Sequence, residues 1–559
     1  VLHMRNNFGL TPQVRFNRSR FDLSHGIKTS FNIGQLVPLD WQEIVPGDTF
    51  KGTLKGVARV STSFLKPVMD NLFMDIHHFF IPYRLVCDYS ERVFGNPNPS
   101  AYTDNDLLSF PTNLQSCEIV KGSVGDYLGL PLGKYAPNTI SLLPFRAFAL
   151  CYNIWFRNEN IVDETYVQTG EAKPSETPNS DPWSPNNYTG MLPKVSRRKD
   201  YFSTCLLAPQ KGAPVQVPIA TGDIPVSSGF VSGNLYEKTM PFSVARSSSG
   251  NGGWDISMNP IDGTTSNLIA NGSNDGIYNT FIKLYNDDNY PLLRVSGQTA
   301  DIEQANFANV NDLRYAFALQ KMLERDALYG SRYNEYLLGH FGVSSPDARL
   351  QLPEYLGGGR IPIQIYQTVQ TSSTSDNSPL GNVAGFSVSE GYSKFSKGFV
   401  EHGICLTVAS VRQFHTYQQG LPKKWFKFER NDFYDPLFAT IGEQPVYSSE
   451  LYHSDNELPK SSVFGYNEAF ADYRSLPNIV TGEMRSNIEN SLDIWHFADY
   501  YNNKPYLTKD FIEETDIFVN RTLEVPSNSQ DTFITDFWFD LPAIRVMPTY
   551  SVPGLIDHH

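Results

Sequence analysis

Residues 67–86, PVMDNLFMDIHHFFIPYRLV, decide the fold of this chain. Apolar side chains occupy both faces of a β-strand drawn through them, with Leu72, Met74, Ile76 and Phe80 on one face and Phe73, Phe79 and Ile81 on the other. A strand with one face in water alternates apolar and polar residues, so this strand is predicted to lie between two covering layers. From Met69 to Arg84 it would span roughly 50 Å, at about 3.3 Å per residue, which indicates a bend or a large sheet.

Further strands are predicted on either side of this stretch. Residues 40–86 as a whole predict two or three strands and almost no helix. Residues 404–409 place apolar side chains on both faces of a strand. Near the end of the chain, a buried strand is expected where Phe533, Phe537, Phe539 and Leu541 alternate with Ile534 and Trp538. In a jelly roll, the first and last strands pair in the same sheet, which would join this strand to the opening stretch.

Two segments have helical periodicity. Residues 143–164 carry aromatic side chains at steps of three and four, which is typical of a helix with a buried aromatic face. A second helix is predicted to begin after Asn309 or Asn311, either of which can cap it, and to end at Gly330. The chain is therefore expected to be mainly β, with a few helices.

Length and composition limit the possible architectures. The 559 residues exceed what one simple core usually covers, so we expect two domains or one domain with large insertions. Hydrophobic residues make up 40% and charged residues only 19%, below the roughly 25% typical of soluble domains. Such a chain indicates many strands and loops, with much of its surface hidden against other subunits.

Charge and cysteine content exclude some functions. The net charge of −14 argues against binding nucleic acid by bulk electrostatics, although local basic patches could still do so. The five cysteines are widely spaced and form no CxxC pair, which predicts reduced core thiols in a cytoplasmic product. No signal-peptide segment and no apolar run of about 18 residues occur, so neither export nor membrane insertion is expected.

Two basic segments stand out in this acidic chain. Residues 1–28 contain Arg5, Arg15, Arg18, Arg20 and Lys28 against one acid, Asp22. The densest basic cluster is Arg197, Arg198 and Lys199. The first segment is either an extended arm packed under a subunit or a contact with phosphates inside a particle. The second is either a solvated or inter-subunit surface or a nucleic-acid contact, so the arginines of both segments and Lys199 are candidate residues facing single-stranded DNA.

Residues 222–309 differ from the rest of the chain. They are rich in Gly, Ser and Asn and hold nine acidic residues against four basic ones, a net charge of −5. Because a structureless loop of this length is unusual within a compact domain, we expect a partly structured surface insertion. It is the best candidate for a receptor-facing element, with these candidate residues: Asn251, Trp254, Asn271, Asp275, Asp287 and Asp288.

Several sequence runs resemble one protein family, in the family's own order. They are RSRFDLSHGIKTSFNIGQLVPL at 18–39, PGDTF at 46–50, residues 67–86, SRRKDYFSTCLLAPQKGAPVQVPIA at 196–220, VNDLRYAFALQKMLERDALYGSRYNEYLLGHFG at 310–342, SPDARLQLPEYLGGG at 345–359, TYQQGL at 416–421 and DFYDPLFATIGEQPV at 432–446. The chain resembles the major capsid protein of gokushovirus-type microviruses, which are single-stranded-DNA bacteriophages. Leu328 and Tyr329 depart from the family pattern, and the resemblance fades over residues 165–193 and 222–309.

The resemblance implies a fold and a function. The fold would be an eight-stranded antiparallel viral jelly roll with large loop insertions. An arm would occupy residues 1–30, the jelly roll 31–221 and 310–559, and a protrusion at the threefold axes 222–309. Copies of the chain would form a T=1 icosahedral shell, the capsid of a virion assembled in the bacterial cytoplasm, around a circular single-stranded DNA genome. Implied partners are an internal scaffolding protein, a small basic DNA-packaging protein, a minor pilot protein and a host surface receptor.

The sequence contains no recognisable catalytic constellation. It has no HExxH, GxSxG or P-loop motif, so neither an enzyme nor a bound cofactor or metal is predicted. His77 and His78 would point to opposite faces of a strand and cannot chelate one ion together. The GGG at 357–359 leads into an alternating strand pattern instead of a phosphate-binding loop. One alternative stays open, a carbohydrate-active β-sandwich enzyme or sugar-binding module that uses paired carboxylates and aromatic rings.

Overall fold

The computed structural model describes residues 17–95, 109–165, 167, 169–170, 190–215, 310–330, 332–371, 380–439, 441–454 and 457–550, together with five short strands between 226 and 300. Two compact units divide the chain. The first contains Val1–Gly212 and Leu323–His559, and the second contains Ala213–Met322. Each unit is described separately below.

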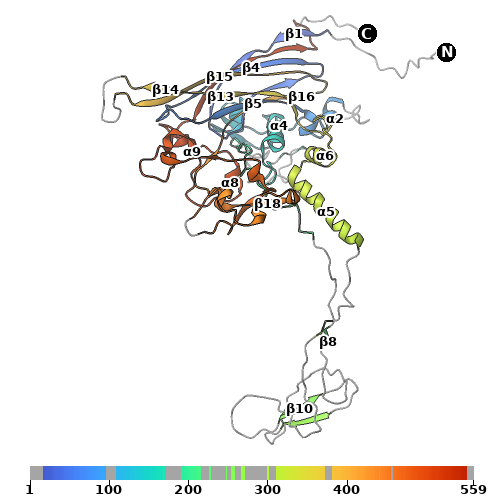
Figure 1. Cartoon of the computed structure of the whole chain (residues 1–559). Helices are drawn as coiled ribbons and strands as arrows, with labels where there is room; N and C mark the ends of the chain where they lie inside the picture. The colour runs from blue at the N-terminus through green and yellow to red at the C-terminus, as the bar shows by residue number, and fades with distance from the viewer. Residues whose placement is uncertain are drawn as a thin grey trace, which may run out of the picture. The chain divides into compact units, whose positions relative to one another are not determined.

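A seven-stranded antiparallel sheet forms one layer of the first unit (Figure 1). Its strands are β1 (Ser19–Asp22), β2 (His25–Phe31), β4 (Thr49–Val60), β14 (Ile365–Val369), β15 (Val383–Gly398), β21 (Phe533–Asp540) and β22 (Pro542–Arg545). β21 lies between β2 and β4, so the end of the chain supplies a central strand. β22 continues it between β1 and β4.

A four-stranded antiparallel sheet forms the second layer, in the order β13-β5-β16-β3. Its strands are β3 (Val37–Ile44), β5 (Leu72–Pro82), β13 (Glu354–Ile363) and β16 (Gly403–Gln413). Only two residues of β5 and one of β16 are less than fully buried. The prediction that both faces of these strands are covered is therefore confirmed. β5 is shorter than the predicted 69–84, because the chain turns at Pro82 into helix α1 (Tyr83–Val86).

The order of the long strands explains how the two sheets enclose one core. Numbered along the chain, β2, β3, β4, β5, β13, β15, β16 and β21 are strands one to eight. The first sheet contains them in the order 1-8-3-6 and the second in the order 2-7-4-5. Consecutive strands thus repeatedly cross from one sheet to the other, as they do in a jelly roll. The mainly β, antiparallel fold class is confirmed, and the last strand pairs in the same sheet as β2, as expected.

The core between the sheets is aromatic and aliphatic, with one polar exception. Phe31, Phe533 and Phe537 of the seven-stranded sheet are fully buried with Met74 of the four-stranded sheet. His78 is also fully buried there, and its ring nitrogens lie 2.9 Å from the hydroxyl of Thr407 and 2.8 Å from that of Ser393. Burial lowers its pKa to about 3, so the imidazole is neutral and serves the core.

The glycine run at 357–359 joins the two sheets at one edge. A Cβ atom on Gly359 would lie 2.6 Å from the carbonyl oxygen of Tyr392, and one on Gly357 would lie 2.8 Å from that of Lys394. Both carbonyls belong to β15 of the other sheet. The strands β13 and β15 can approach this closely only because these positions lack side chains. The run is a packing device within a strand, in agreement with the predicted strand.

The predicted buried C-terminal strand is only half buried. In β21, Phe533, Phe537 and Phe539 face the core, whereas Ile534 and Trp538 are about half exposed, at 50% and 52%. The outward face of the seven-stranded sheet is not covered by another layer among the described residues. The apolar residues on the two faces of β21 therefore have different environments, and the expectation of a buried C-terminal strand holds for one face only.

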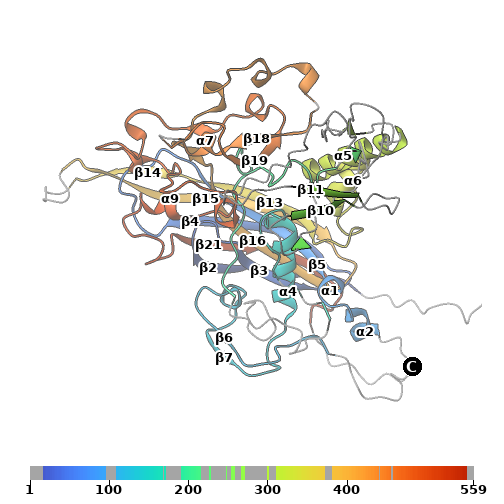
Figure 2. The same ribbon diagram turned by 90° about the horizontal axis from the view of Figure 1, so that it is seen from below.

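Helices and loops cover the opposite side, against the four-stranded sheet (Figures 1 and 2). The helix predicted at 143–164 is confirmed as α4 (Leu143–Cys151), but it continues only as one π-helical turn, η3 (Tyr152–Phe156). The other elements are α2 (Ser90–Gly95), α3 (Val124–Tyr127), α6 (Tyr333–Phe341), α7 (Ser448–Leu451), α8 (Lys509–Ile512), α9 (Ile517–Asn520), and the strand pairs β6 (Cys117–Ile119) with β7 (Gly133–Tyr135), β17 (Thr416–Tyr417) with β20 (Asn478–Ile479), and β18 (Glu443–Tyr447) with β19 (Val463–Glu468).

The second unit contains small strands and the beginning of a long helix. β10 (Trp254–Met258) pairs with β9 (Ser247–Ser248) and β11 (Ser266–Ala270), and β8 (Val226–Ser227) pairs with β12 (Thr299–Ala300). Helix α5 (Val310–Tyr329) ends at Gly330, whose φ of 105° is the left-handed conformation expected of a glycine stop. The predicted insertion, 222–309, falls within this unit.

Two other expectations concern the whole chain. All five cysteines are free and buried, which confirms the predicted core thiols. Among the described residues, no helix has both the length and the apolar character needed to cross a membrane.

The close approach of β13 and β15 predicts the effect of a single methyl group. Gly359→Ala should lower the free energy of unfolding by about 1–3 kcal/mol, because the new Cβ must push the β15 backbone away. Gly95→Ala is the control, since a Cβ there meets no atom within 4 Å, and it should change stability by less than about 1 kcal/mol. Denaturant unfolding of both variants would measure this, and equal stabilities would contradict the packing role of Gly359.

Candidate functional site

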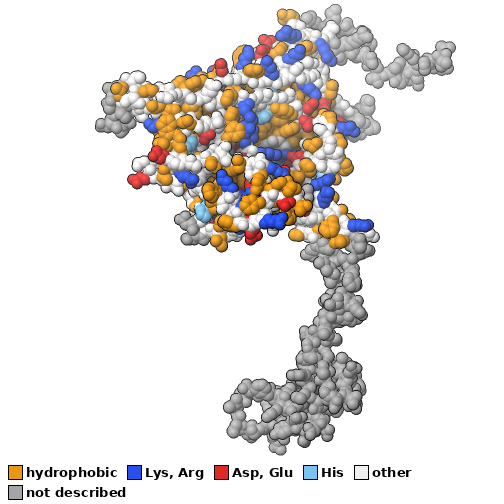
Figure 3. All heavy atoms as spheres, in the orientation of Figure 1, with side chains coloured by type: hydrophobic (Ala, Val, Ile, Leu, Met, Phe, Trp, Pro, Cys, Tyr) orange, Lys and Arg blue, Asp and Glu red, His pale blue; other side chains and the backbone are white. Residues whose placement is uncertain are grey.

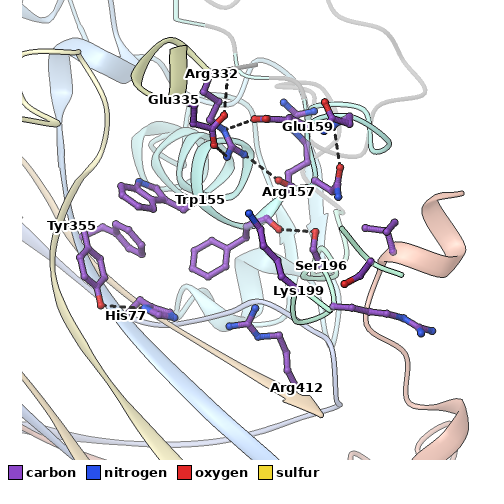
Figure 4. A pocket seen from close by; sticks show the side chains of 17 residues that line it. His77, Trp155, Arg157, Glu159, Ser196, Lys199, Arg332, Glu335, Tyr355 and Arg412 are labelled. Carbon is purple, nitrogen blue, oxygen red and sulfur yellow. Dashed lines mark hydrogen bonds and ion pairs between the residues drawn. The ribbon is translucent and has the colours of Figure 1, made fainter. Parts of the chain in front are cut away.

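A pocket of about 420 Å³ lies on the outward side of the four-stranded sheet, away from the seven-stranded one. Its walls come from β5, β13 and β16, from the end of the helix α4–η3, from α6 and from the segment 196–203 (Figure 4). It includes Lys199, one of the basic residues predicted to meet DNA. An aromatic group lines it, and a charged group that reaches the pocket through Arg412 lies beside it.

The aromatic group is formed by Phe79, Trp155 and Tyr355. Their ring centroids lie 5.5 to 5.9 Å from one another. Phe79 is buried, while 37% of Trp155 and 42% of Tyr355 are exposed, so two ring surfaces face the pocket and solvent. His77 packs beside them, and burial lowers its pKa to about 4, which keeps the imidazole neutral. This wall can stack on a flat ligand group.

The charged group lies where the β-strands bring distant residues together. Asp75 of β5 is buried and binds two guanidinium groups, with Arg360 Nε at 2.6 Å and Arg412 Nη2 at 2.7 Å. Desolvation would raise the pKa of Asp75, but the two arginines outweigh it and lower that pKa. One carboxylate thus holds two arginines, and the group has an excess positive charge.

Arg198 and Lys199 add to this positive charge. The guanidinium of Arg198 lies over Phe414, 4.2 Å from the ring centroid, in a cation–π contact. Lys199 is exposed and lines the pocket near Arg412 (Figure 4). Among the described residues, it has no ion-pair partner. Its ammonium group is therefore available to an anion, with the arginines close by.

Arg332 closes another side of the pocket. It lies 3.0 Å from Glu159 and 3.5 Å from Glu335, and it donates a hydrogen bond to the backbone oxygen of Arg157. Burial and the neighbouring Glu159 raise the pKa of Glu335. These two carboxylates share one arginine and fix the start of α6. They are not a separated acid and base of the kind that the carbohydrate alternative requires.

Arg197 borders the pocket, but its charge is already paired inside the protein. Residues 195 and 197 form backbone hydrogen bonds with residues 34, 512 and 514, so the segment is extended and neighbouring side chains point in opposite directions. The Arg197 side chain is buried and donates to Asp499 at 2.7 Å, while Arg198 points the other way. The expectation that Arg197 faces DNA is thereby corrected, because its charge is used within the core.

The partners of Arg197 form a buried charged network. His415 lies 2.8 Å from Asp499 and 3.2 Å from Glu514, and the Tyr501 hydroxyl donates to Asp499 at 2.6 Å. Burial disfavours charge on His415, but the two carboxylates outweigh it and raise its pKa to about 9. The Asp499 pKa falls to about 2 for the reciprocal reason. The network joins the loops to the sheets and is structural.

Other predicted site residues lie elsewhere or outside the described residues. Arg18 and Arg20 are exposed at the start of β1, on the seven-stranded sheet. Arg5, Arg15, Asn251, Asn271, Asp275, Asp287 and Asp288 lie outside the described residues, and only the backbone of Trp254, in β10, is described. No group of three or more potential metal-binding side chains occurs among the described residues.

Sequence reasoning missed Asp75, Arg360 and Arg412. A signal was present, because each is a charged residue within an otherwise apolar strand. Their meeting depends on strand register: Asp75 is opposite Arg360, and Arg412 is opposite Phe73. The lining hydroxyls are also structural, since Ser196 and Ser203 donate to backbone oxygens. The pocket can bind an anionic or aromatic group, and its lining offers no nucleophile paired with a base.

Comparison with known proteins gives consistent results along the chain. The family model described as "Capsid protein (F protein)" matches residues 11–555. Capsid protein VP1 of Bdellovibrio phage phiMH2K is 37% identical over 557 residues, covering 99% of this chain and 98% of the relative. Capsid protein VP1 of Chlamydia phage 1 is 36% identical, covering 99% and 98%. Capsid protein VP1 of Spiroplasma virus 4 is 34% identical, covering 98% and 97%.

Substitutions at neighbouring positions can separate the core role of Arg197 from the surface role of Lys199. Arg197→Ala leaves Asp499 buried without its guanidinium and should cost about 3–5 kcal/mol of unfolding free energy. Lys199→Ala removes an exposed charge and should change stability by no more than about 0.5 kcal/mol. Chemical denaturation of the two variants would test this, and a small loss for Arg197→Ala would show that the network contributes little.

Proposed function

The chain belongs to the capsid protein (F protein) family, and from that premise we propose that its copies close a T=1 icosahedral shell around a circular single-stranded DNA genome. The resemblance to gokushovirus-type microvirus capsid proteins is confirmed, and the chain is a structural virion protein, not an enzyme. The observation that carries the proposal is the family match over nearly the whole length, including the segments that form both sheets.

The surface of the first unit supports assembly with other copies. Residues 428–441 expose several large apolar side chains, including Phe428 at 80% and Leu437 at 83%. The same stretch contains two short 3₁₀ segments, η6 (Arg430–Asp432) and η7 (Pro436–Phe438), and loops, which no second layer covers among the described residues. Exposed apolar stretches of this kind mark interaction surfaces, and in a closed shell symmetry repeats each contact many times.

Other partners follow from the charge and from the family. A shell of subunits with a net charge of −14 needs added positive charge to hold DNA, which a small basic DNA-packaging protein would supply. We also propose an internal scaffolding protein and a minor pilot protein as partners, and assembly in the bacterial host cytoplasm. The N-terminal arm, residues 1–30, would contact DNA or a neighbouring subunit.

The insertion at residues 222–309 is proposed as the threefold protrusion that meets the host receptor. Its strands β8 and β12 pair at the start and end of the excursion, with Ser227 opposite Thr299. This pairing would allow the sequence between them to vary without disturbing the sheets of the first unit. Asn251, Trp254, Asn271, Asp275, Asp287 and Asp288 remain the candidate receptor residues.

Sedimentation of the purified chain tests the shell directly. We expect uniform icosahedral particles far heavier than the 63.0 kDa chain, visible by negative-stain microscopy, with DNA protected from nuclease. Phe428→Asp with Leu437→Asp should leave the monomer folded, because both side chains are exposed, but should abolish particles. A wild-type chain that stays monomeric even with its scaffolding protein would refute the proposal.

Shortening the insertion tests the receptor role. Residues 228–298 can be replaced by Asn-Gly, a two-residue turn that suits the antiparallel pair Ser227 and Thr299. Particles should form as before but should no longer adsorb to the cells that propagate the phage. In the control variant, residues 228–298 are kept and Asn-Gly is inserted after Ser227, so that the effect of the new junction is measured alone. Normal adsorption of the shortened particles would assign receptor binding to another surface.

A further inference from the structure

One surface of the first unit has no role in the site described above. It is the outward face of the seven-stranded sheet, called here the open face. The long strands β4 and β21 alternate along their length between buried and exposed residues, so one complete face of this sheet is accessible. Figure 1 shows the helices and loops on the other side of the two sheets. Figure 3 shows basic side chains along the edge where β1 and β4 lie.

The centre of the open face is a row of aromatic and basic residues. Strand register places Lys55 of β4 between Trp538 of β21 and Tyr392 of β15. These rings are 52% and 62% exposed. On the next strand, Gly26 is opposite Trp538, and a Cβ there would lie 3.3 Å from the indole. The indole therefore rests over Gly26, with its other face open to solvent.

Basic residues surround this row. Lys51, Lys55 and Arg59 occupy every second outward-facing position of β4, about 14 Å apart at the strand rise of about 3.4 Å per residue. Within the described part of the chain, none of the three has an ion-pair partner. Lys394 lies over Tyr392, 4.8 Å from the ring centroid. Lys28 is different, because it pairs with Asp536 at 3.1 Å.

The open face is positive in an otherwise acidic protein. Its basic residues are Arg20, Lys28, Lys51, Lys55, Arg59 and Lys394, and its acidic residues are Asp22, Asp536, Asp540 and Glu390. This gives a net charge of +2, compared with −14 for the chain. Two copies of the face would repel each other, whereas a polyanion would be attracted.

We propose that the open face binds single-stranded DNA, with bases stacked on Trp538 and Tyr392 and phosphates held by Lys51, Lys55 and Arg59. The inference rests on the proposed enclosure of a single-stranded genome and names the surface that meets it. Sheets that bind unpaired nucleic acid combine exposed rings with a basic surface, because every base has a face that can stack. A duplex hides its base faces and could use only the charges.

The places where the chain leaves and re-enters the first unit agree with an open face that is directed toward the genome. The chain leaves the unit at Gly212, soon after the pocket-lining segment 196–203, and returns at Leu323, shortly before Arg332 and Glu335, which also line the pocket. The backbone N–H of Lys211 donates to the Leu323 carbonyl, which holds the junctions together. The two junctions of the first unit thus lie near its pocket and away from the open face, which suits an open face that is directed toward the genome.

Binding of a labelled 30-nucleotide dT oligonucleotide to the full chain tests the proposal. In fluorescence anisotropy, the triple variant Lys51→Gln, Lys55→Gln, Arg59→Gln should bind at least about tenfold more weakly. The slope of log affinity against log salt should fall by about 2, since about 0.7 counterions are released per phosphate contact on a single strand. Trp538→Ala with Tyr392→Ala should weaken binding by about fivefold or more, with the salt slope unchanged.

A matched control removes three charges elsewhere. Arg349, Lys424 and Lys509 are exposed, lie outside the seven-stranded sheet and outside residues 428–441, and their change to Gln lowers the net charge equally. This variant should bind the oligonucleotide as the wild type does. Equal weakening by both triple variants would reduce the effect to overall charge and overturn the proposal. So would equal affinity of the wild type for duplex and single strand.

Sedimentation of the same variants separates this inference from the proposed capsid role. Each variant should melt within a few degrees of the wild type, because every changed side chain is exposed. The open-face triple variant should still form shells, but with less protected DNA. Loss of shells with unchanged oligonucleotide binding would make the open face a subunit interface and overturn the proposal. Absence of wild-type shells would instead count against the capsid role.

Discussion

The first unit depends on one constraint, that β5 and β16 have apolar side chains on both faces. A strand of this kind cannot border water, so one side must be covered by a second sheet and the other by helices and loops. The seven-stranded sheet covers the first side. Helix α4, its π-helical turn and the segments after residue 190 cover the second, and the pocket lies where this second cover is incomplete.

This constraint gives the two sheets different surroundings. The central strands β5 and β16 of the four-stranded sheet are buried on both faces, whereas the seven-stranded sheet has an open face with lysines and aromatic rings. The charged side chains on the two sides also differ in whether they have ion-pair partners. On the covered side, Asp75 and Asp499 hold arginines in ion pairs, but on the open face Lys51, Lys55 and Arg59 have no such partner in the described structure. The open face can therefore attract an external anion more readily.

Much of the fold could be predicted from local pattern, because burial on both faces leaves an unbroken apolar run in the sequence. This applied to β5, to β16 and to the stop of α5 at Gly330. Pattern alone could not tell that Trp538 is exposed while Phe537 is buried, since the two residues are equally apolar. It also could not separate Arg197 from Lys199 within one basic cluster. Their difference depends on Asp499, which is 302 residues from Arg197 in sequence, and the pocket likewise depends on strand register.

The central position of β21 has a consequence for synthesis of the chain. This strand fills the place between β2 and β4, about five hundred residues after β2 has been made. Until β21 has been synthesised, β2 and β4 have no shared neighbour, and the two strand edges that β21 will join remain unpaired. A nascent chain would hold an unfinished sheet for most of its time on the ribosome, when chaperones could protect it. Products that stop early lack the central strand and cannot complete the sheet, so the fold itself excludes truncated chains from assembly.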